Sequence, residues 1–375
     1  MTSLPYVLLF CFFLCTAFLE HNLIRQNRIL AVRIIVVVMA LFFFGLRGHV
    51  LTDFINYYRF FEKLDLSTLL SGESIYQPGF VLKAYLSKLV SDNYHFWIFV
   101  TSAIHVLIIS AVFKKYVGNI SLGLIFFLGY RGIYIEFNLL QNFMAILLFF
   151  VSIPFLYRRQ LLPYLLLNVI GMSFHITSIL YLPLYFVLHR DTNMRTGLVV
   201  IALANLFYFL GSDLLVRSAY WVISNSGYAA LEGFLYFFVD TSSYKLSFGF
   251  LERTMIILLM TFYCEKIKSE IPHGTIFYNL ALLYYFSFLL FSPIDVLADR
   301  IPTLFLLSYW VVIPALIVFR HRYRVLIACA LIPLSFAKLV LSTQDEVSAY
   351  DNLVFGIRPF EERLSDVLRH NERNQ

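Results

Sequence analysis

Three amide side chains, those of Asn138, Gln141 and Asn142, stand at the start of a long apolar run, IEFNLLQNFMAILLFF at residues 135–150. Offsets of three and four residues would place all three on one face of a helix. Polar side chains that face lipid are costly, so we expect this stripe to face protein, water or a ligand. Amides donate and accept hydrogen bonds, which suits them to a ligand rich in hydroxyl groups.

Charged side chains gather near the ends of other apolar runs. They are Arg47, Asp53, Arg131, Glu136, Arg253, Asp295, Asp299, Arg300 and Lys338. Arginine binds phosphate groups through paired hydrogen bonds, so an excess of arginine beside a membrane cleft suits a diphosphate. The alternative is that these are ordinary polar helix ends, whose side chains reach the membrane surface. That alternative is weaker for Arg253, Arg300 and His175, which lie within or beside apolar runs.

Motifs for several other chemistries are absent from the sequence. It has no zinc-ligand spacing, P-loop, dinucleotide-binding glycine motif or serine-nucleophile elbow, and its carboxylates form no obvious metal-binding cluster. We therefore expect no metal ion and no cofactor. His105, in the middle of an apolar run, is better explained as a core histidine bonded to a neighbour than as a catalyst.

The composition is that of a membrane protein. Of 375 residues, 60% are hydrophobic and only 14% are charged, which leaves too little polar material to cover a soluble globule. The net charge of +6 comes as small clusters between apolar runs and forms no long basic stripe, so it does not indicate a nucleic-acid partner. The sequence predicts an all-α, polytopic membrane bundle.

About 12 apolar runs approach the length needed to cross a bilayer. Alternate connections carry the lysines and arginines, which places those connections in the cytoplasm and the others outside. Residues 1–341 then form the transmembrane domain, with outer loops at 47–93 and 212–247, and residues 342–375 form an outward-facing tail. Within the first loop, YQPGFVLKAYLSKLV is spaced as an amphipathic helix.

One pair of runs is too short for two crossings. About 30 residues separate Arg159 from Arg190, both cytoplasmic by charge, whereas two crossings need about 40 residues. The spacing predicts a shallow helical hairpin with the sequence SFH at its apex and His175 below the outer surface. Interrupted helices at membrane depth normally line a cavity.

Several stretches together resemble the EpsG-like polysaccharide polymerases. FGLRGHVLTDFINYYRFF matches that family's opening motif at Arg47, Asp53 and Tyr57, and YQPGFVLKAYLSKLVSDNYHFW matches its proline-glycine-aromatic segment at residues 78–80. SFHITSILYLPLYFVL is similar to its Phe-His hairpin, and ADRIPTLFLLSYWVVIPALI places Arg300 on its late arginine. These stretches follow the family's order and cover most of the chain.

The resemblance implies a Wzy-type glycosyltransferase with a GT-C-like fold in the bacterial inner (cytoplasmic) membrane. Such enzymes join oligosaccharide repeat units carried on undecaprenyl diphosphate into O-antigen, capsule or exopolysaccharide, alongside flippase and chain-length regulator proteins. The site residues would be Arg300 with Arg253 and Arg47 for the diphosphate, His175 and Asp53 as candidate bases, and Tyr57, Gln77, Asn138, Gln141 and Asn142 for the sugar.

Three other functions fit part of the pattern. A transporter or flippase for a polar solute would carry its ionisable groups at the membrane midplane and show repeat symmetry, which this chain does not. A polysaccharide ligase or another lipid-carrier transferase, such as an acyltransferase, suits an outward arginine-rich site equally well. A structural membrane protein without a site would leave the clustering of polar residues unexplained.

Two positions depart from the family pattern. Gln141 stands where relatives carry arginine, and Gln77 stands where they carry glutamate. If these positions face each other, the loss of both charges leaves an amide pair and avoids an unpaired buried charge. Gln141→Arg alone should therefore lower the yield of folded protein more than the double variant Gln141→Arg, Gln77→Glu, measured by size exclusion in detergent. Equal yields for the two variants would refute the pairing.

Overall fold

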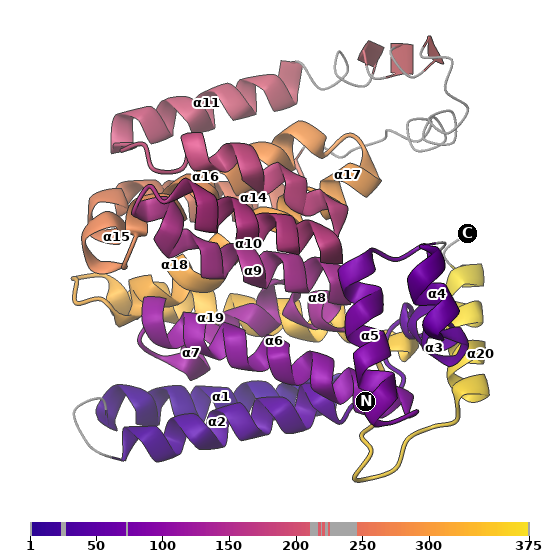
Figure 1. Cartoon of the computed structure of the whole chain (residues 1–375). Coiled ribbons are helices and arrows are strands. Elements are labelled where there is room, and N and C mark those ends of the chain that lie inside the picture. Colours follow the sequence, from indigo (N-terminus) through magenta and orange to yellow (C-terminus); the bar gives the residue numbers. More distant parts are fainter. Residues whose placement is uncertain are drawn as a thin grey trace. The chain divides into compact units, whose positions relative to one another are not determined.

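The computed structural model describes residues 2–23, 28–72, 74–210 and 246–373, together with a few positions between 217 and 225. Within these residues the chain is helical and has no β-strand, so the all-α class is confirmed (Figure 1). The chain divides into two compact units, residues 1–186 with 313–375 and residues 187–312, and each is described by itself. Most of the predicted second outer loop, 212–247, lies outside the described residues.

The helices of the first unit are α1 (Leu4–Leu23), α2 (Ile29–Gly45), α3 (Phe54–Lys63), α4 (Leu66–Ser71), α5 (Pro78–Val90), α6 (Tyr94–Tyr116), α7 (Ile120–Phe127), the π-helical turn η1 (Leu128–Gly132), α8 (Ile133–Asn138), α9 (Leu140–Tyr157), α10 (Leu161–Phe174), the 3₁₀ helix η2 (Ile176–Phe186), α19 (Arg324–Ser342), the 3₁₀ turn η5 (Glu346–Ser348) and α20 (Phe360–Arg373). The second unit holds α11 (Met194–Leu210), α14 (Phe248–Phe262), α15 (Cys264–Glu270), α16 (Gly274–Phe291), α17 (Asp295–Arg300) and η4 (Pro302–Phe305), and α18 (Leu307–Val318) crosses the boundary.

In the part of the chain that the structure describes, six helices are long and apolar enough to cross a membrane. They are Leu4–Leu23, Tyr94–Tyr116, Ile120–Asn138, Leu140–Tyr157, Gly274–Phe291 and Arg324–Ser342, and a seventh span results if the bent pair Leu297–Phe305 and Leu307–Val318 is one crossing. These helices are those of a membrane-embedded protein. They are fewer than the 12 apolar runs because several runs fold into helices of 10–17 residues, too short to meet the length of a full crossing.

The predicted stripe of three amides on one helix is wrong. The chain breaks at Leu139 (φ −109°, ψ 45°), so Asn138 ends α8 while Gln141 and Asn142 lie in the first turn of α9. The apolar span that begins at Ile120 continues to Asn138 through a kink at Tyr130 and Arg131. Arg131 and Glu136 therefore lie within this bent span, and Asn138 is available to bond a different segment.

The chain between Arg159 and Arg190 forms the predicted helical hairpin, whereas its depth in a membrane stays a prediction. α10 ends at Phe174, the chain is extended at His175 (φ −154°, ψ 127°), and η2 returns along α10. The Tyr164 hydroxyl donates to the carbonyl of Tyr181, and the Ser178 hydroxyl donates to the carbonyl of Asn168 at 3.3 Å. A 3₁₀ helix rises about 2.0 Å per residue against about 1.5 Å for an α-helix, so both arms reach about 20 Å although η2 has fewer residues.

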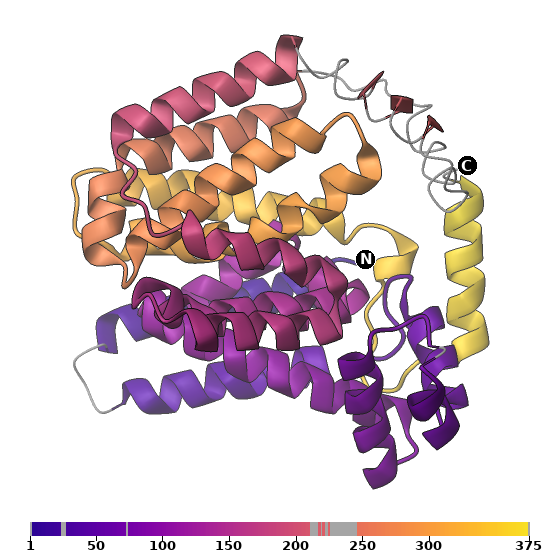
Figure 2. The same cartoon turned by 45° about the horizontal axis from the view of Figure 1, so that its top comes forward.

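The C-terminal segment packs against the start of the first outer loop. The backbone amide of Gly48 donates to the carbonyl of Asp351, and that of Leu353 donates to the carbonyl of Leu46. α20 lies beside α3, where Phe54 packs against Val367 (α20 is the yellow helix marked C in Figures 1 and 2). The segment is therefore fixed to residues 46–54 of the same unit.

Arg363 is the link that holds this segment. Its side chain is 1% exposed, and its guanidinium donates to the carbonyls of His49, Val347 and Ala349. It also forms an ion pair with Asp366 at 3.4 Å. Arg363 thus donates to the carbonyl of His49, to that of Val347 in η5 and to that of Ala349, which follows η5.

Removal of this link should free the C-terminal segment. Arg363→Ala leaves several buried carbonyls without donors, and each lost hydrogen bond to a charged group costs about 1.5–3 kcal/mol. We expect faster proteolytic cleavage between residues 342 and 360 and a lower melting temperature in detergent. Arg373→Ala, which removes an arginine that is 66% exposed, is the matched control. Equal cleavage rates for the two variants would contradict the role of Arg363.

Candidate functional site

A buried ionic cluster joins three helices of the first unit. One carboxylate oxygen of Glu136, on α8, is hydrogen-bonded to His105 Nδ1 at 2.8 Å. The other carboxylate oxygen is 3.7 Å from Arg47 Nη1. Arg47, just after α2, donates to the Ser102 hydroxyl of α6 at 2.8 Å and to the carbonyl of Phe44 at 2.6 Å. All four polar side chains of the cluster are at most 4% exposed.

The cluster assigns structural roles to two residues from the sequence analysis. His105 is bonded to a buried neighbour, as the sequence predicted. Arg47 was expected to contact a diphosphate, but its guanidinium is enclosed, lies 4.4 Å from the centre of the Phe137 ring and also donates to the carbonyl of Glu136. Arg47 therefore holds the end of α2 against α6 and α8 and does not reach a ligand directly.

Asn138 bonds to the segment that contains Thr52, Asp53 and Tyr57. Its side-chain oxygen accepts from the backbone amides of Thr52 and Asp53, both at 3.3 Å, and its carbonyl accepts from the Tyr57 hydroxyl at 2.7 Å. Asn138 and Tyr57 are buried, whereas Asp53 is half-buried. Three predicted site residues are thus brought together, and of the three it is the Asp53 carboxylate that remains partly open to solvent.

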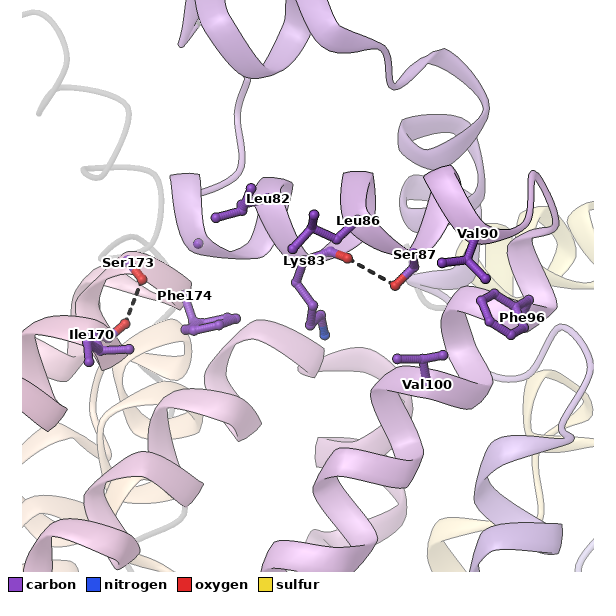
Figure 3. Close-up of a pocket in the computed structure, with 11 residues that line it drawn as sticks. Leu82, Lys83, Leu86, Ser87, Val90, Phe96, Val100, Ile170, Ser173 and Phe174 are labelled. Atoms are coloured by element: carbon purple, nitrogen blue, oxygen red, sulfur yellow. Dashed lines mark hydrogen bonds between the residues drawn. The ribbon is translucent and has the colours of Figure 1, made fainter.

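The proline-glycine-aromatic segment meets the hairpin apex. Gly79, in the first turn of α5, approaches Ser173 so closely that an added Cβ would lie 2.2 Å from the Ser173 hydroxyl. Beside this contact is a pocket of about 520 Å³ between α5, α6 and α10 (Figure 3). Its walls are mostly apolar and include Leu86, Ile170 and Phe174.

Lys83 is the charged residue of this pocket, and sequence analysis did not find it. Its ammonium donates to the Thr101 hydroxyl at 3.0 Å and lies 5.2 Å from the centre of the Phe80 ring. Burial lowers the pKa of the Lys83 amine to about 7, against the opposing attraction of Glu136. The lysine lies within an amphipathic pattern, where a lysine normally faces solvent, so the sequence held no signal for its burial.

His175 is half-buried at the hairpin apex. Its Nδ1 lies 2.7 Å from the Thr177 hydroxyl and accepts from the backbone amide of Thr177 at 3.3 Å. With Nδ1 as the acceptor, the proton of the neutral imidazole is on Nε2. In this tautomer Nε2 carries a proton that it can donate, and a role of His175 as base stays a prediction.

The remaining amides of the sequence analysis lie at two helix starts. Gln77 is the N-cap residue of α5 and Gln141 is in the first turn of α9, and both are partly exposed. Asn142 is buried, with its side-chain oxygen unbonded. Leu140 and Phe80, which neighbour these amides, share one hydrophobic cluster, although the described contacts include no hydrogen bond between Gln77 and Gln141.

A second pocket, of about 300 Å³, is formed by residues 56–76. Tyr76 and Phe60 form part of its wall, with ring centres 4.6 Å apart, and Asn56, Arg59 and Lys63 supply polar groups. Aromatic faces combined with hydrogen-bonding side chains form a surface on which a sugar ring can stack.

Two of the three arginines expected to bind diphosphate, Arg253 and Arg300, belong to the second unit. Arg253 on α14 donates to the Tyr284 hydroxyl at 3.0 Å and to the carbonyl of Gly249 at 2.9 Å, and it lies 4.1 Å from the centre of the Phe288 ring. Arg300 ends α17 with an exposed side chain. Within the described residues, no group of three or more histidine, cysteine, aspartate or glutamate side chains could hold a metal ion.

The helices and the buried ionic cluster define a membrane-embedded helical protein in which residues of the segment 47–93 meet α8 and α10 within one unit. The model of the EpsG family matches residues 30–352, and the chain belongs to the EpsG family. Membership indicates a membrane role of the polysaccharide polymerase or glycosyltransferase kind, and it confirms the resemblance found in the sequence. Neither the curated proteins nor the solved structures include a match to this chain.

Substitution of Arg47 tests how much the buried ionic cluster stabilises the folded protein. Arg47→Met leaves the Glu136 carboxylate with His105 alone, and removing one partner of a buried pair costs about 3–5 kcal/mol. The double variant Arg47→Met, Glu136→Gln should recover part of the lost melting temperature in detergent. Lys114→Met, at an exposed lysine of α6, is the control. Strictly additive losses in the double variant would show that the pair is not coupled.

The low pKa of Lys83 should make stability depend on pH. An unfolded lysine keeps its proton up to about pH 10.4, whereas folded Lys83 releases it near pH 7. The unfolded state then binds more protons between these values, so stability should rise with pH by up to about 1.4 kcal/mol per unit. The difference in melting temperature between the native protein and Lys83→Met should be constant below about pH 7 and shift in favour of the native protein towards pH 9. Parallel curves over the whole range would contradict the shift.

Proposed function

We propose that this EpsG-family protein polymerises oligosaccharide repeat units carried on undecaprenyl diphosphate into O-antigen, capsule or exopolysaccharide. The reaction would take place at the outer face of the cytoplasmic membrane of a bacterium. The proposal extends the family assignment to a particular donor, product and location.

One observation supports this proposal most strongly. Family-matched segments far apart in the chain meet in the first unit: Asn138 bonds the segment with Asp53 and Tyr57, and Gly79 contacts Ser173 beside His175. His175 follows Phe174, which lines the apolar pocket, and Asp53 lies three residues before Asn56, which lines the aromatic one. A lipid-linked sugar needs both kinds of surface.

The proposed chemistry is a metal-independent transfer of a glycosyl group. The bond between the anomeric carbon and the diphosphate oxygen breaks, and a bond from that carbon to an acceptor hydroxyl forms. The Asp53 carboxylate takes the hydroxyl proton as general base, and His175 Nε2 donates a hydrogen bond to the reacting sugars. Arg253 and Arg300 stabilise the negative charge that develops on the diphosphate leaving group.

The two pockets would bind chemically different parts of the substrate. The apolar pocket beside Lys83 would take part of the prenyl chain, and the outer pocket with Tyr76 and Phe60 would hold sugar rings. Gln77, Gln141 and Asn142 would supply hydrogen bonds to sugar hydroxyls. Tyr57 and Asn138 bond to each other, so they would shape the sugar site from behind.

The proposed topology follows the charge pattern. About 12 segments enter or cross the bilayer in a GT-C-like arrangement, some of them as short helices, and the loops 47–93 and 212–247 and the segment 342–375 face outward. A flippase that supplies the repeat units and a chain-length regulator are the expected protein partners.

Deletion of the gene tests this function directly. We expect the deletion strain to carry single repeat units on its lipid anchor, visible on a polysaccharide gel as loss of the ladder. Complementation with Asp53→Asn should leave single units although the protein reaches the membrane in normal amounts. Asp92→Asn, at an outer-loop carboxylate that is 79% exposed, should restore the ladder. Loss of all surface polysaccharide would indicate a ligase instead, and an unchanged ladder would exclude both functions.

A further inference from the structure

The pocket of about 520 Å³ between α5, α6 and α10 contains a cation that its protein contacts satisfy only in part. The Lys83 ammonium has three N–H donors, and its described hydrogen bond is a single one, to the Thr101 hydroxyl. The Phe80 ring, 5.2 Å away, attracts the positive charge but brings no oxygen acceptor. A prenyl chain in this pocket would leave the other donors without acceptors. A ligand that completes the pocket must bring an acceptor to Lys83.

The other polar side chains of the pocket use their protons within the protein. The Ser173 hydroxyl donates to a carbonyl of its own helix at 2.7 Å, and the Ser87 hydroxyl donates to the carbonyl of Lys83 at 3.0 Å (Figure 3). The described lining residues include no aspartate or glutamate. Figure 3 shows the Lys83 side chain extending from α5 towards the side where Phe174 and Val100 lie. The pocket thus offers one cationic group among apolar walls.

A stripe of apolar side chains on α5 leads into this pocket. Leu82, Leu86 and Val90 line it, and their spacing of four residues places them on one face of the helix. They are 45%, 54% and 75% exposed, and Ile170 of α10, which also lines the pocket, is 48% exposed. Exposed apolar side chains on two of the helices that form the pocket suit an opening towards lipid. The stripe extends about 12 Å along α5.

We propose that this pocket binds a fatty acid, with its carboxylate on Lys83 and its acyl chain along the stripe formed by Leu82, Leu86 and Val90. A carboxylate has two oxygens and accepts charge-assisted hydrogen bonds from an ammonium. One carboxylate also balances one cation, whereas a diphosphate would bring more negative charge than a single ammonium neutralises in apolar surroundings. A phospholipid fits less well, because its glycerol esters would find no free hydroxyl donor at Ser87 or Ser173.

The buried groups around Lys83 determine how binding depends on pH. Burial lowers the pKa of the Lys83 amine to about 7, and the Glu136 carboxylate of α8 opposes this shift. His105 of α6, hydrogen-bonded to Glu136, also interacts electrostatically with Lys83. Below about pH 7 the site is cationic before the ligand arrives. Above that pH a carboxylate binds with uptake of a proton by Lys83, so its affinity falls as the pH rises.

Binding of decanoate to the full-length protein in a maltoside detergent tests the site. The dissociation constant is measured by calorimetry, with decanol as the uncharged comparison ligand. At about pH 6.5 we expect Lys83→Met to weaken decanoate binding at least about tenfold and to leave decanol binding unchanged. Lys88→Met is the matched control, because Lys88 is on the same helix but bonds the carbonyls of Phe61 and Glu62 and is not among the residues lining the pocket.

A second variant gives an answer even if Lys83→Met does not fold. Lys83→Arg keeps its positive charge at every pH of the experiment, so it should retain most of the affinity for decanoate. From about pH 6.5 to about pH 9 the native protein should lose at least about tenfold in affinity, whereas Lys83→Arg should lose little. The same loss in both proteins would show that another group titrates and would overturn the proposal.

Three further outcomes would also overturn it. They are equal affinity of the native protein and Lys83→Met for decanoate, binding of decanol as tight as that of decanoate, and tighter binding of didecanoyl phosphatidylglycerol than of decanoate. The last result would assign the pocket to a phospholipid.

A fatty acid at Lys83 would occupy the space proposed for the prenyl chain, and free fatty acids would then inhibit polymerisation. This consequence rests on the proposed function, whereas the titration measures binding without polymerisation. An unchanged polysaccharide ladder after gene deletion would therefore refute the polymerase without bearing on the fatty-acid site, which the titration decides.

Discussion

A carboxylate buried among membrane helices must be matched by nearby positive charge and hydrogen-bond donors, and Glu136 imposes this requirement on the first unit. Arg47 from the end of α2 and His105 from α6 meet it. Because the carboxylate is on the short helix α8, these contacts fix α8 against two long helices. The chain can then turn sharply at Leu139 and start α9 in a new direction.

Further links connect this centre to residues 49–53 and to the C-terminal segment. Asn138, two residues after Glu136, bonds the backbone at Thr52 and Asp53, and Arg363 bonds the carbonyl of His49 a few residues earlier. In both cases a buried polar side chain satisfies backbone groups that the loop cannot satisfy by itself. Asn138 of α8 and Arg363 of the C-terminal segment therefore both help to fix the backbone around the half-buried Asp53.

The sequence was sufficient for the features that depend on composition and length. The excess of apolar residues predicted an all-helical membrane protein, and the short distance between Arg159 and Arg190 predicted the hairpin with His175 at its apex. The motifs that contain Arg47 and Arg300 were enough to identify the EpsG family. The bonded core position of His105 followed from its apolar surroundings.

Features that depend on contacts between segments far apart in the chain could not be predicted from the sequence. Leu139 is neither glycine nor proline, so nothing at this position marked the break that separates Asn138 from Gln141 and Asn142. The burial of Lys83, the enclosure of Arg47 and the docking of Arg363 each require contact between segments far apart in the chain. A charge near a helix end has the same appearance in sequence whether it meets a ligand or an internal partner.

The 3₁₀ winding of η2 sets the length of this arm of the hairpin. Its 11 residues are stretched by about 0.5 Å each relative to an α-helix, so rewinding the whole arm would shorten it by about 5 Å. The apex at His175 would then shift along the arm by about one turn of helix, with no residue inserted or removed. The position of the imidazole is thus tied to the winding of the helix that follows it.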